Sequence, residues 1–424
     1  MPPVPRQASV LHRAPVVLPI GAEPIRDGGV LVDGQRIGWV GPAARYDGPT
    51  VATQDWPGLL LPGLVNAHAH LQYTAYADMY APDVDFFAWI ARFPVRNRDT
   101  PEPAWAESAR AGVAELLRTG TTCVADITVQ RAAIEAVADA GLAGVSYVEV
   151  VGADAASWPD HRARLLATLS TADGRRAVGV SPHAPYTLSS QVFGDCVALA
   201  RERRLRLHPH VAESSYETEF VAAGTGAFAE ANRRWGLDME LMRKPGRQSP
   251  VGYVDGLAGL GPDVHVAHGV RVSAVDRARL RERGTVVALC ARSNATLGCG
   301  APPVAAYRAE GNAVAVGTDS RASVPSLDLL AELGLLREIA LGQGSPEAGL
   351  DRWLVEAATV GGARAMGLTD VGVLTPGARA DLAAFDVPLD GDPYVALVRY
   401  GAGRCLGTVV AGRQARQAGA GMGG

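Results

Sequence analysis

In the stretch Leu61-Pro-Gly-Leu-Val-Asn-Ala-His-Ala-His70, an apolar strand leaves a Pro-Gly turn and ends in two histidines. Side chains alternate between the two faces of a strand, so His68 and His70 point the same way. Two neutral imidazoles placed like this can share one divalent ion. The same pattern arises by chance on many strands, so the metal interpretation depends on residues further along the chain.

From His70 onward, segments with helical period alternate with apolar strands. The sequence predicts helices at residues 102–118, 130–140, 161–171 and 190–203. It predicts strands at residues 121–126, 144–150, 177–181, 205–211, 264–268, 285–290 and 313–319. Counted from Leu59, this makes eight strands with helices between them. Such alternation favours parallel βαβ units, and eight of them fit a closed (β/α)8 barrel better than an open sheet.

Both ends of the chain instead carry short apolar runs separated by Gly and Asp, without helical period. These runs are residues 16–20, 29–32, 36–41, 371–377, 380–385 and 407–413. Strands and tight turns at this spacing predict an antiparallel sheet. We therefore expect a small β-sandwich domain made from residues 1–57 and 368–424, beside a barrel made from residues 58–367. Residues 417–424 are rich in Gly and Ala and are predicted to be disordered.

Composition argues against several classes of protein. The 424 residues are 48% hydrophobic and 20% charged, which is ordinary for a globular protein with a sizeable core. A net charge of -4 without a basic run argues against nucleic acid as a partner. No apolar stretch reaches the ~18 to 20 residues that span a bilayer, and no convincing signal-peptide site is present, so we expect a cytoplasmic protein. The five cysteines are an odd, scattered set that we expect to be reduced.

Polar residues gather where the predicted barrel strands end, which is where barrel enzymes carry their reacting groups. These residues are His68, His70, His183, His210, Glu213, His268, Asn294 and Asp319. Seven of nine histidines lie on or just after the strands, and only His12 and His161 do not. A single such residue is usually structural, but a cluster of this size is hard to obtain by chance. The predicted metal ligands are His68, His70, His210 and Asp319. His265, deeper in its strand, should face away and be structural.

These residues match the pattern of a known family. The chain resembles the amidohydrolase superfamily, in its branch of nucleobase and nucleoside deaminases and chlorohydrolases. The matching segments run in order along nearly the whole chain: Pro62-Gly-Leu-Val-Asn-Ala-His-Ala-His70, Ser181-Pro-His-Ala-Pro-Tyr-Thr187, His210-Val-Ala-Glu213, Ala267-His-Gly269, Arg292-Ser-Asn-Ala295, Gly317-Thr-Asp-Ser320 and Gly372-Val-Leu-Thr-Pro-Gly377. The resemblance implies a metal-dependent barrel hydrolase and also the small β domain built from both ends.

Within this branch, residues 292–304 and 317–323 look closest to the aminodeoxyfutalosine deaminases of the alternative menaquinone pathway. This resemblance implies that 6-amino-6-deoxyfutalosine is the substrate and futalosine the product. Relatives that act on methylthioadenosine or adenosylhomocysteine carry a Leu-Arg-Gly segment after the His-x-His pair, where this chain has Tyr76-Ala-Asp78. The departure argues against their ribose-binding arrangement and leaves the particular substrate open.

The lysines indicate how many metal ions to expect. Many members of the superfamily bridge two metals with a carboxylated lysine at the end of strand four. Here Lys244 is the only lysine and lies after strand five. We therefore expect one ion. Zinc is the default for three imidazoles and a carboxylate, and ferrous iron is compatible with the same ligands.

The residue types suggest a deamination chemistry. Zinc lowers the pKa of bound water to about 7. Asp319 would accept or steer the water proton, Glu213 would carry a proton to a ring nitrogen, and His268 would stabilise the attacking oxygen. Hydroxide then adds at the amino-bearing carbon, and ammonia leaves. The alternative for Glu213 is a charge at the N-terminus of the helix after strand five.

Substrate contacts are predicted with alternatives left open. His183 resembles the family's substrate-contacting histidine, and the alternative is a loop histidine held by the backbone. Gln72 could touch the base or be a polar loop residue, and Arg292 and Asn294 are further candidates. If a benzoate is bound, an arginine suits its carboxylate, and aromatic side chains can pack its ring. The candidates are Arg92, Arg96, Arg98, Arg292, Arg321, Phe86, Phe87, Trp89 and Phe93. Alternatively, residues 85–90 form a buried amphipathic helix.

The sequence supports three functional hypotheses. The first is a zinc aminohydrolase that acts on an adenine-type nucleoside, including adenosine, methylthioadenosine or adenosylhomocysteine. The second is a hydrolase that removes chloride or an amine from another heteroaromatic ring, such as a triazine, guanine or cytosine. The third is a metal-free binding scaffold. The expected partner is a small nucleoside, and a homodimer is compatible with the sequence.

Overall fold

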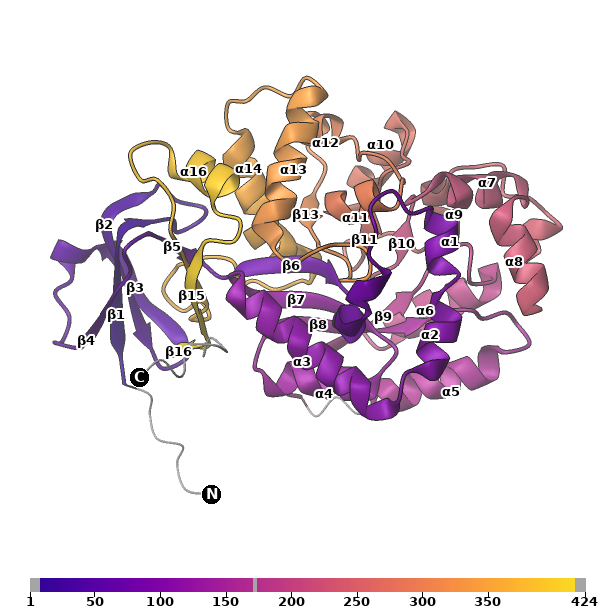
Figure 1. Ribbon diagram of the computed structural model, residues 1–424, viewed down its shortest axis with the longest axis horizontal. Helices are drawn as coiled ribbons and strands as arrows, with labels where there is room; N and C mark the ends of the chain where they lie inside the picture. Colours follow the sequence, from indigo (N-terminus) through magenta and orange to yellow (C-terminus); the bar gives the residue numbers. More distant parts are fainter. Residues whose placement is uncertain (1–7, 171–173, 416–424) are drawn as a thin grey trace.

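The computed structural model describes residues 8–170 and 174–415. The predicted disordered tail, residues 417–424, lies outside the described residues. Figure 1 shows a large lobe in which helices surround a set of parallel strands, and a smaller lobe of strands beside it.

The large lobe is a closed parallel barrel, as predicted. Its strands are β6 (Leu64–Ala69), β7 (Thr121–Thr128), β8 (Ala143–Val150), β9 (Ala177–Pro182), β10 (His210–Val211), β11 (His265–His268), β12 (Val286–Leu289) and β13 (Val314–Val316). They form two four-stranded sheets, β6-β7-β8-β9 and β10-β11-β12-β13. Leu207 bridges the two sheets through Val180 and Val264, and a bridge from Ala69 to Asp319 closes the ring.

The four predicted helices are present, each within three residues of its expected bounds. They are α3 (Glu102–Arg118), α4 (Arg131–Asp139), α5 (Trp158–Leu169) and α6 (Ser190–Glu202). Local capping fixes several ends: the Ser189 side chain accepts from the Val192 amide at the start of α6. The other helices are α1 (Phe86–Ile90), α2 (Phe93–Asp99), α7 (Ser215–Ala223), α8 (Ala227–Trp235), α9 (Pro250–Gly256), α10 (Ala274–Arg283), α11 (Ala291–Thr296), α12 (Val304–Glu310), α13 (Leu329–Gly342), α14 (Leu350–Glu356), α15 (Gly362–Ala365) and α16 (Pro393–Tyr400).

Two barrel strands are shorter than predicted. The fifth was expected over residues 205–211, but regular pairing is confined to His210 and Val211, because Pro209 has no amide hydrogen to donate. The eighth was expected over residues 313–319, but it ends at Val316, and Asp319 adopts a left-handed conformation with φ 61°. Strand five is therefore regular only at its carboxyl end, which carries His210, whereas strand eight ends before Asp319.

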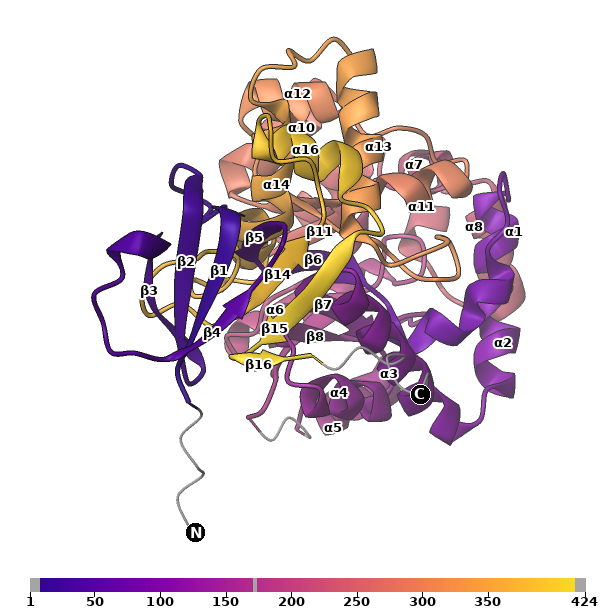
Figure 2. The ribbon, with the colours of Figure 1, turned by 60° about the vertical axis from the view of Figure 1, so that its left-hand side comes forward.

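The small lobe contains strands from both ends of the chain. Its strands are β1 (Val10–Val17), β2 (Ile25–Asp33), β3 (Arg36–Pro42), β4 (Ala52–Asp55), β5 (Leu59–Pro62), β14 (Leu382–Phe385), β15 (Cys405–Val410) and β16 (Arg413–Gln414). Seven of them follow the order β16-β15-β14-β5-β1-β2-β3, and β4 pairs with β1. Val30 of β2 and Val409 of β15 belong to one hydrophobic core with Trp56. Figure 2 turns this lobe toward the viewer.

Two expectations for the small lobe need correction. The stretch from Leu61 to His70 is two strands: β5 pairs with β1 and β14, and β6 enters the barrel after Gly63. The expected boundary at residue 58 therefore falls before a strand that belongs to the small sheet. Residues 371–377 form turns, in which Gly372 and Gly377 have φ of 74° and 88°.

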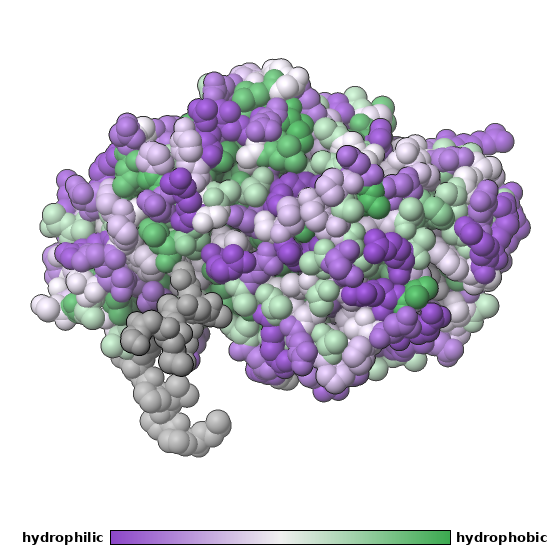
Figure 3. Space-filling view, viewed as in Figure 1, coloured by the Kyte–Doolittle hydropathy of each residue, from purple (hydrophilic) through white to green (hydrophobic). Residues whose placement is uncertain are grey.

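The surface shown in Figure 3 mixes hydrophobic and hydrophilic residues. Exposed large hydrophobic side chains are dispersed along the sequence: Val95, Val151, Trp235, Val275 and Tyr400. Within residues 8–170 and 174–415, no helix is long and apolar enough to cross a membrane. The homodimer stays a prediction.

Candidate metal centre and active site

The four predicted metal ligands meet at the carboxyl ends of three strands. His70 Nε2 lies 3.3 Å from His210 Nε2. Asp319 Oδ1 lies 3.7 Å from His68 Nε2 and 3.6 Å from His70 Nε2. Two imidazoles that bind zinc at about 2.0–2.1 Å in a tetrahedron place their nitrogens about 3.3 Å apart. The spacing between His70 and His210 therefore fits one shared ion.

An unpartnered nitrogen supports the same fit. His68 is fully buried, yet its Nε2 has no hydrogen-bond partner within the described residues. A buried nitrogen without a partner is costly unless it binds something else. One ligand atom from each of His68, His70 and His210 lies within 4.8 Å of the others, and the same holds for His68, His268 and Asp319.

Hydrogen bonds below the centre set which nitrogen each histidine presents. His208 Nδ1 lies 2.9 Å from the His265 carbonyl oxygen and must donate to it. In a neutral imidazole the other nitrogen, Nε2, then accepts from His68 Nδ1 at 2.9 Å, which leaves a lone pair on His68 Nε2. Burial lowers the pKa of His68 and of His208 well below the usual value, so both rings are neutral. His210 Nδ1 likewise faces the His183 carbonyl at 3.1 Å, which leaves the lone pair on Nε2, the nitrogen that faces His70.

This arrangement predicts that His208 supports metal binding without touching the ion. Replacing His208 by leucine removes the acceptor that orients His68, and we expect about 10- to 100-fold weaker metal affinity. Competition with a chromogenic chelator measures the affinity, and circular dichroism checks the fold. His161→Leu, outside the barrel centre, should leave the affinity unchanged. Equal affinities for the His208 variant and the wild type would contradict the role.

Asp319 is held by its backbone and by two serines. Ser293 Oγ donates to Asp319 Oδ2 at 2.6 Å and Ser323 Oγ at 3.3 Å, so Oδ1 is left facing the histidines. The amides of Thr318 and Asp319 both donate to the His68 carbonyl at 3.0 Å. Close approach requires glycine at Gly317, since a Cβ there would lie 2.5 Å from His68 Cβ. Local sequence thus fixes the carboxylate next to the first strand.

Glu213 faces the metal centre and does not act as the helix charge considered from sequence. The carboxylate of Glu217 takes that place, accepting from the amides of Ala212 and Glu213 at 3.0 and 2.7 Å. Glu213 Oε1 instead lies 3.4 Å from His268 Nε2. Burial, and then the charges of Asp319 and Glu217, raise the pKa of Glu213 well above its usual value. A carboxyl group with such a pKa can hold and deliver a proton near neutral pH.

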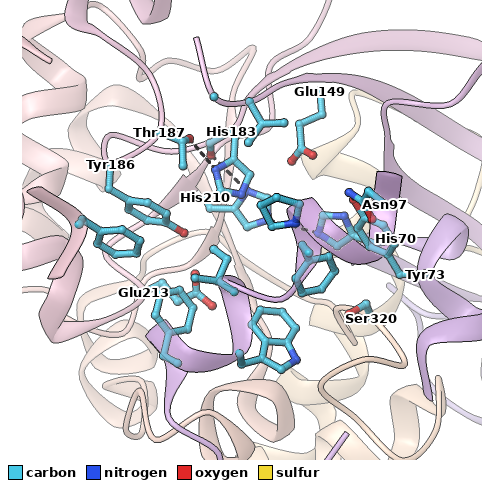
Figure 4. Close-up of a pocket in the computed structure, with 18 of the residues that line it drawn as sticks. His70, Tyr73, Asn97, Glu149, His183, Tyr186, Thr187, His210, Glu213 and Ser320 are labelled. Carbon is cyan, nitrogen blue, oxygen red and sulfur yellow. Dashed lines mark hydrogen bonds between the residues drawn. The ribbon is translucent and has the colours of Figure 1, made fainter. Parts of the chain in front are cut away.

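Beyond the metal centre lies a cavity of about 400 Å³. Figure 4 shows His183, His210, Tyr73 and Tyr186 around it. Seven of the residues that line it are Phe, Tyr or Trp: Tyr73, Phe86, Trp89, Phe93, Tyr186, Phe228 and Trp235. His183 also lines it. Its Nδ1 is hydrogen-bonded to Thr187 Oγ1 at 2.8 Å, so only Nε2 is available to another group. The centre and the cavity together suit an aromatic substrate that meets the ion at one end.

Several predicted substrate contacts lie outside this cavity. The Gln72 side-chain oxygen accepts from Thr128 Oγ1 at 2.6 Å and from the Val129 amide. Asn294 Oδ1 lies 3.0 Å from His268 Nδ1, so it orients His268. Arg292 donates to the Ser326 and Asp328 carbonyls. Each side chain is hydrogen-bonded to neighbouring protein groups and none lines the cavity, so contact of these three residues with substrate stays a prediction.

The arginines expected for a carboxylate are also elsewhere. No arginine or lysine of the described chain lines the cavity. Arg96 pairs with Asp78 at 3.1 Å, Arg98 with Asp99 and Arg321 with Glu115. Arg92 donates to the Met79 carbonyl. Three of the four aromatic candidates, Phe86, Trp89 and Phe93, do line the cavity. The fourth, Phe87, packs against Tyr216 and Phe228. Residues 86–90 are also helical, as in the alternative.

Polar residues of the cavity wall that are not among the site residues predicted from the sequence include Asn97, Glu149 and Ser320. Glu149 ends β8, so the criterion that found the other strand-end residues could have found it. Burial raises the pKa of Glu149 to about 8. Ser320 follows Asp319, and its hydroxyl has no partner within the described residues.

Glu332, beneath Arg292, predicts a pH dependence of stability. Burial raises its pKa to about 8, against an unfolded value of about 4.3. Between these values the folded protein holds a proton that the unfolded chain has lost, so the free energy of unfolding falls as pH rises. The slope from this group is at most about 1.4 kcal/mol per pH unit. Thermal unfolding of metal-loaded protein from about pH 5 to about pH 8 should show a shallower slope for Glu332→Gln; an unchanged slope would refute this.

A closed barrel with three histidines and an aspartate at its strand ends defines a metal-dependent hydrolase barrel. The model of the amidohydrolase family matches residues 59–415, and the chain belongs to this family. The predicted family, the barrel with an additional domain and the assignment as a hydrolase of carbon–nitrogen bonds are thereby confirmed.

Individual relatives are similar over most of their length. The 5-methylthioadenosine/S-adenosylhomocysteine deaminase of Nitratidesulfovibrio vulgaris (strain DSM 19637 / Miyazaki F) is 34% identical over 378 residues, which are 87% of this chain and 79% of the relative. A solved adenosine deaminase from Xanthomonas campestris with bound zinc has a TM-score of 0.82 at 25% identity and covers 97% and 93% of the two chains. Helicobacter pylori aminofutalosine deaminase in complex with methylthio-coformycin shares the fold at 20% identity, with a TM-score of 0.82 and coverage of 96% and 100%.

Proposed function

We propose that this protein uses one divalent metal ion to remove the amino group from the adenine-type base of a nucleoside, releasing ammonia. The observation that carries the proposal is that the buried carboxyl group of Glu213 lies next to the cluster of predicted metal ligands. The cluster presents Nε2 lone pairs of His68 and His210, and the Glu213 carboxyl lies beside it, 3.4 Å from His268 Nε2. The deaminases among the relatives support the reaction type.

His68, His70, His210 and Asp319 would hold the ion. When bound, such an ion supplies the Lewis acidity that lowers the pKa of a water molecule to about 7. Zinc is the default for these ligands, and the bound zinc of the Xanthomonas deaminase supports it. Metal analysis of purified protein tests the choice between zinc and iron, and the absence of stoichiometric metal would favour a non-catalytic scaffold.

The protein's own residues move the protons. Asp319 Oδ1, free of its serine contacts, can accept a proton from the attacking water. Glu213 can give its proton to the ring nitrogen next to the amino-bearing carbon, which makes that carbon electrophilic. His268, oriented by Asn294, presents Nε2 toward the attacking oxygen and Glu213. Water adds to the carbon, and ammonia leaves after a second proton transfer.

For the particular nucleoside, we propose 6-amino-6-deoxyfutalosine. The aromatic wall of the cavity suits the benzoate ring of this nucleoside, and Tyr76-Ala-Asp78 replaces the segment expected for methylthioadenosine enzymes. The carboxylate must then reach solvent at the cavity mouth. Methylthioadenosine is the second candidate. The lack of a cationic side chain among the described lining residues favours it, as does the relative from Nitratidesulfovibrio.

A substrate panel tests the proposal. Adenosine, methylthioadenosine, adenosylhomocysteine and 6-amino-6-deoxyfutalosine are incubated with metal-loaded protein, and ammonia release is measured. We expect the highest kcat/KM for 6-amino-6-deoxyfutalosine. A higher value for methylthioadenosine would select the second candidate. Turnover of none of them, with chloride or ammonia release from a triazine or another heteroaromatic ring, would replace the nucleoside proposal.

A further inference from the structure

We propose that Glu149 is a further substrate-binding residue, whose carboxyl group binds the hydroxyl groups of the nucleoside's ribose. This inference rests on the proposed function. Glu149 ends β8 at the edge of the barrel where reacting groups lie, and its side chain lines the cavity.

The carboxyl group of Glu149 lacks partners in the protein. The residue is only 9% exposed, and no described residue donates a hydrogen bond to either oxygen; Oε1 is fully covered. Buried carboxyl oxygens are normally paired, because losing water without a replacement is costly. A group left unpaired at the wall of a substrate cavity therefore points to a hydrogen-bond donor on the ligand.

The position of Glu149 separates it from the groups that act on the base. Figure 4 shows Glu149 and Glu213 on opposite sides of the imidazoles of His183 and His210. Glu213 lies with His268, whereas a ligand atom of Glu149 lies within 4.8 Å of one on His183 and one on His210. When the base engages Glu213 and His268, the sugar is the part of a nucleoside that can reach Glu149.

A second metal ion does not explain the group formed by Glu149, His183 and His210. His210 Nδ1 donates to the His183 carbonyl, and its Nε2 faces His70 in the first centre. His210 therefore has no lone pair left for another ion. A vicinal diol does match the site: one hydroxyl can donate to one carboxyl oxygen, and the other can donate to the second oxygen or accept from it when it carries a proton, much as ribose meets acidic residues in dinucleotide sites.

The experiment compares two stable nucleosides that differ only in the diol, inosine and 2′,3′-dideoxyinosine. Calorimetric titration of metal-loaded full-length protein should show about 10- to 100-fold tighter binding of inosine. Glu149→Leu should bind the two nucleosides equally, with unchanged metal content, and Glu149→Gln should keep part of the preference. Glu332→Gln is the control, since its carboxyl is also buried and its Oε1 also accepts no hydrogen bond from the described residues, but it lies outside the cavity, 3.8 Å from Arg292. It should keep the full preference.

Equal affinity of the wild type for both nucleosides, no detectable binding of inosine, or a preference that survives in Glu149→Leu would each overturn the assignment. Failure of this inference can be distinguished from failure of the proposed function. Deamination of adenine nucleosides without a diol preference would refute the inference alone. A preference that depends on Glu149, without deamination of any adenine nucleoside, would refute the proposed function alone.

Discussion

Glu213→Gln is expected to lower kcat for the best nucleoside substrate by about 10²- to 10⁴-fold. The amide keeps the shape of the side chain but cannot give a proton to the ring nitrogen. Since Glu213 is not a ligand, metal content should stay stoichiometric. Nucleoside binding should change little, so the loss should fall on kcat and not on KM.

The control for this variant is Glu217→Gln, four residues further on. Glu217 is also buried, and its carboxylate accepts from the amides of Ala212 and Glu213. Its loss should reduce thermal stability more than turnover. A Glu213→Gln enzyme with wild-type kcat, or one that has lost its metal, would show that Glu213 is not the proton carrier.

The second large effect is expected from His210→Ala, which removes the predicted metal ligand that β10 supplies. We expect loss of stoichiometric metal and a fall in turnover of at least about 10³-fold, because three remaining ligands hold the ion weakly and misplace the nucleophile. Chelation of the wild type should give the same loss, and added zinc should restore the wild type but not the variant. Metal analysis and ammonia release measure both effects.

The matched control is His12→Ala. His12 is buried in the small lobe, where its Nδ1 accepts from the Trp56 indole at 3.1 Å, far from the ligand cluster in the fold. This variant should lower stability and keep its metal. Full metal content and activity in His210→Ala would exclude His210 from the centre.

The barrel could be predicted because its strands are buried on both faces and read as continuous apolar runs. Thr121–Thr128 and Ala143–Val150 show this most clearly, since nearly every residue is buried. The predictions failed where a single residue overrides the run. Pro209 removes a donor from strand five, and strand eight ends early, before Asp319 takes a left-handed conformation with φ 61°.

The metal ligands could be predicted because strand periodicity and barrel topology decide where they lie. His68 and His70 share a strand face, and barrel topology brings His210 and Asp319 to the same edge. The distal wall could not, because Tyr186, Phe228 and Trp235 come from separate loops and helices whose packing leaves no local pattern. The hydrogen-bond partners of Arg292 and Gln72, Ser326 and Thr128, could not be predicted for the same reason, because they are distant in sequence.

The seam between β6 and β13 has a consequence for the order of assembly. The amides of Thr318 and Asp319 bond to His68, so the barrel closes at the residues that would bind the ion. A chain emerging from the ribosome exposes His68, His70 and His210 well before Asp319. The full ligand set therefore exists only after the last strand has packed against the first. Metal should accordingly bind late in folding, when the barrel is complete. Hydrogen exchange at Thr318 and Asp319 should slow when metal is added.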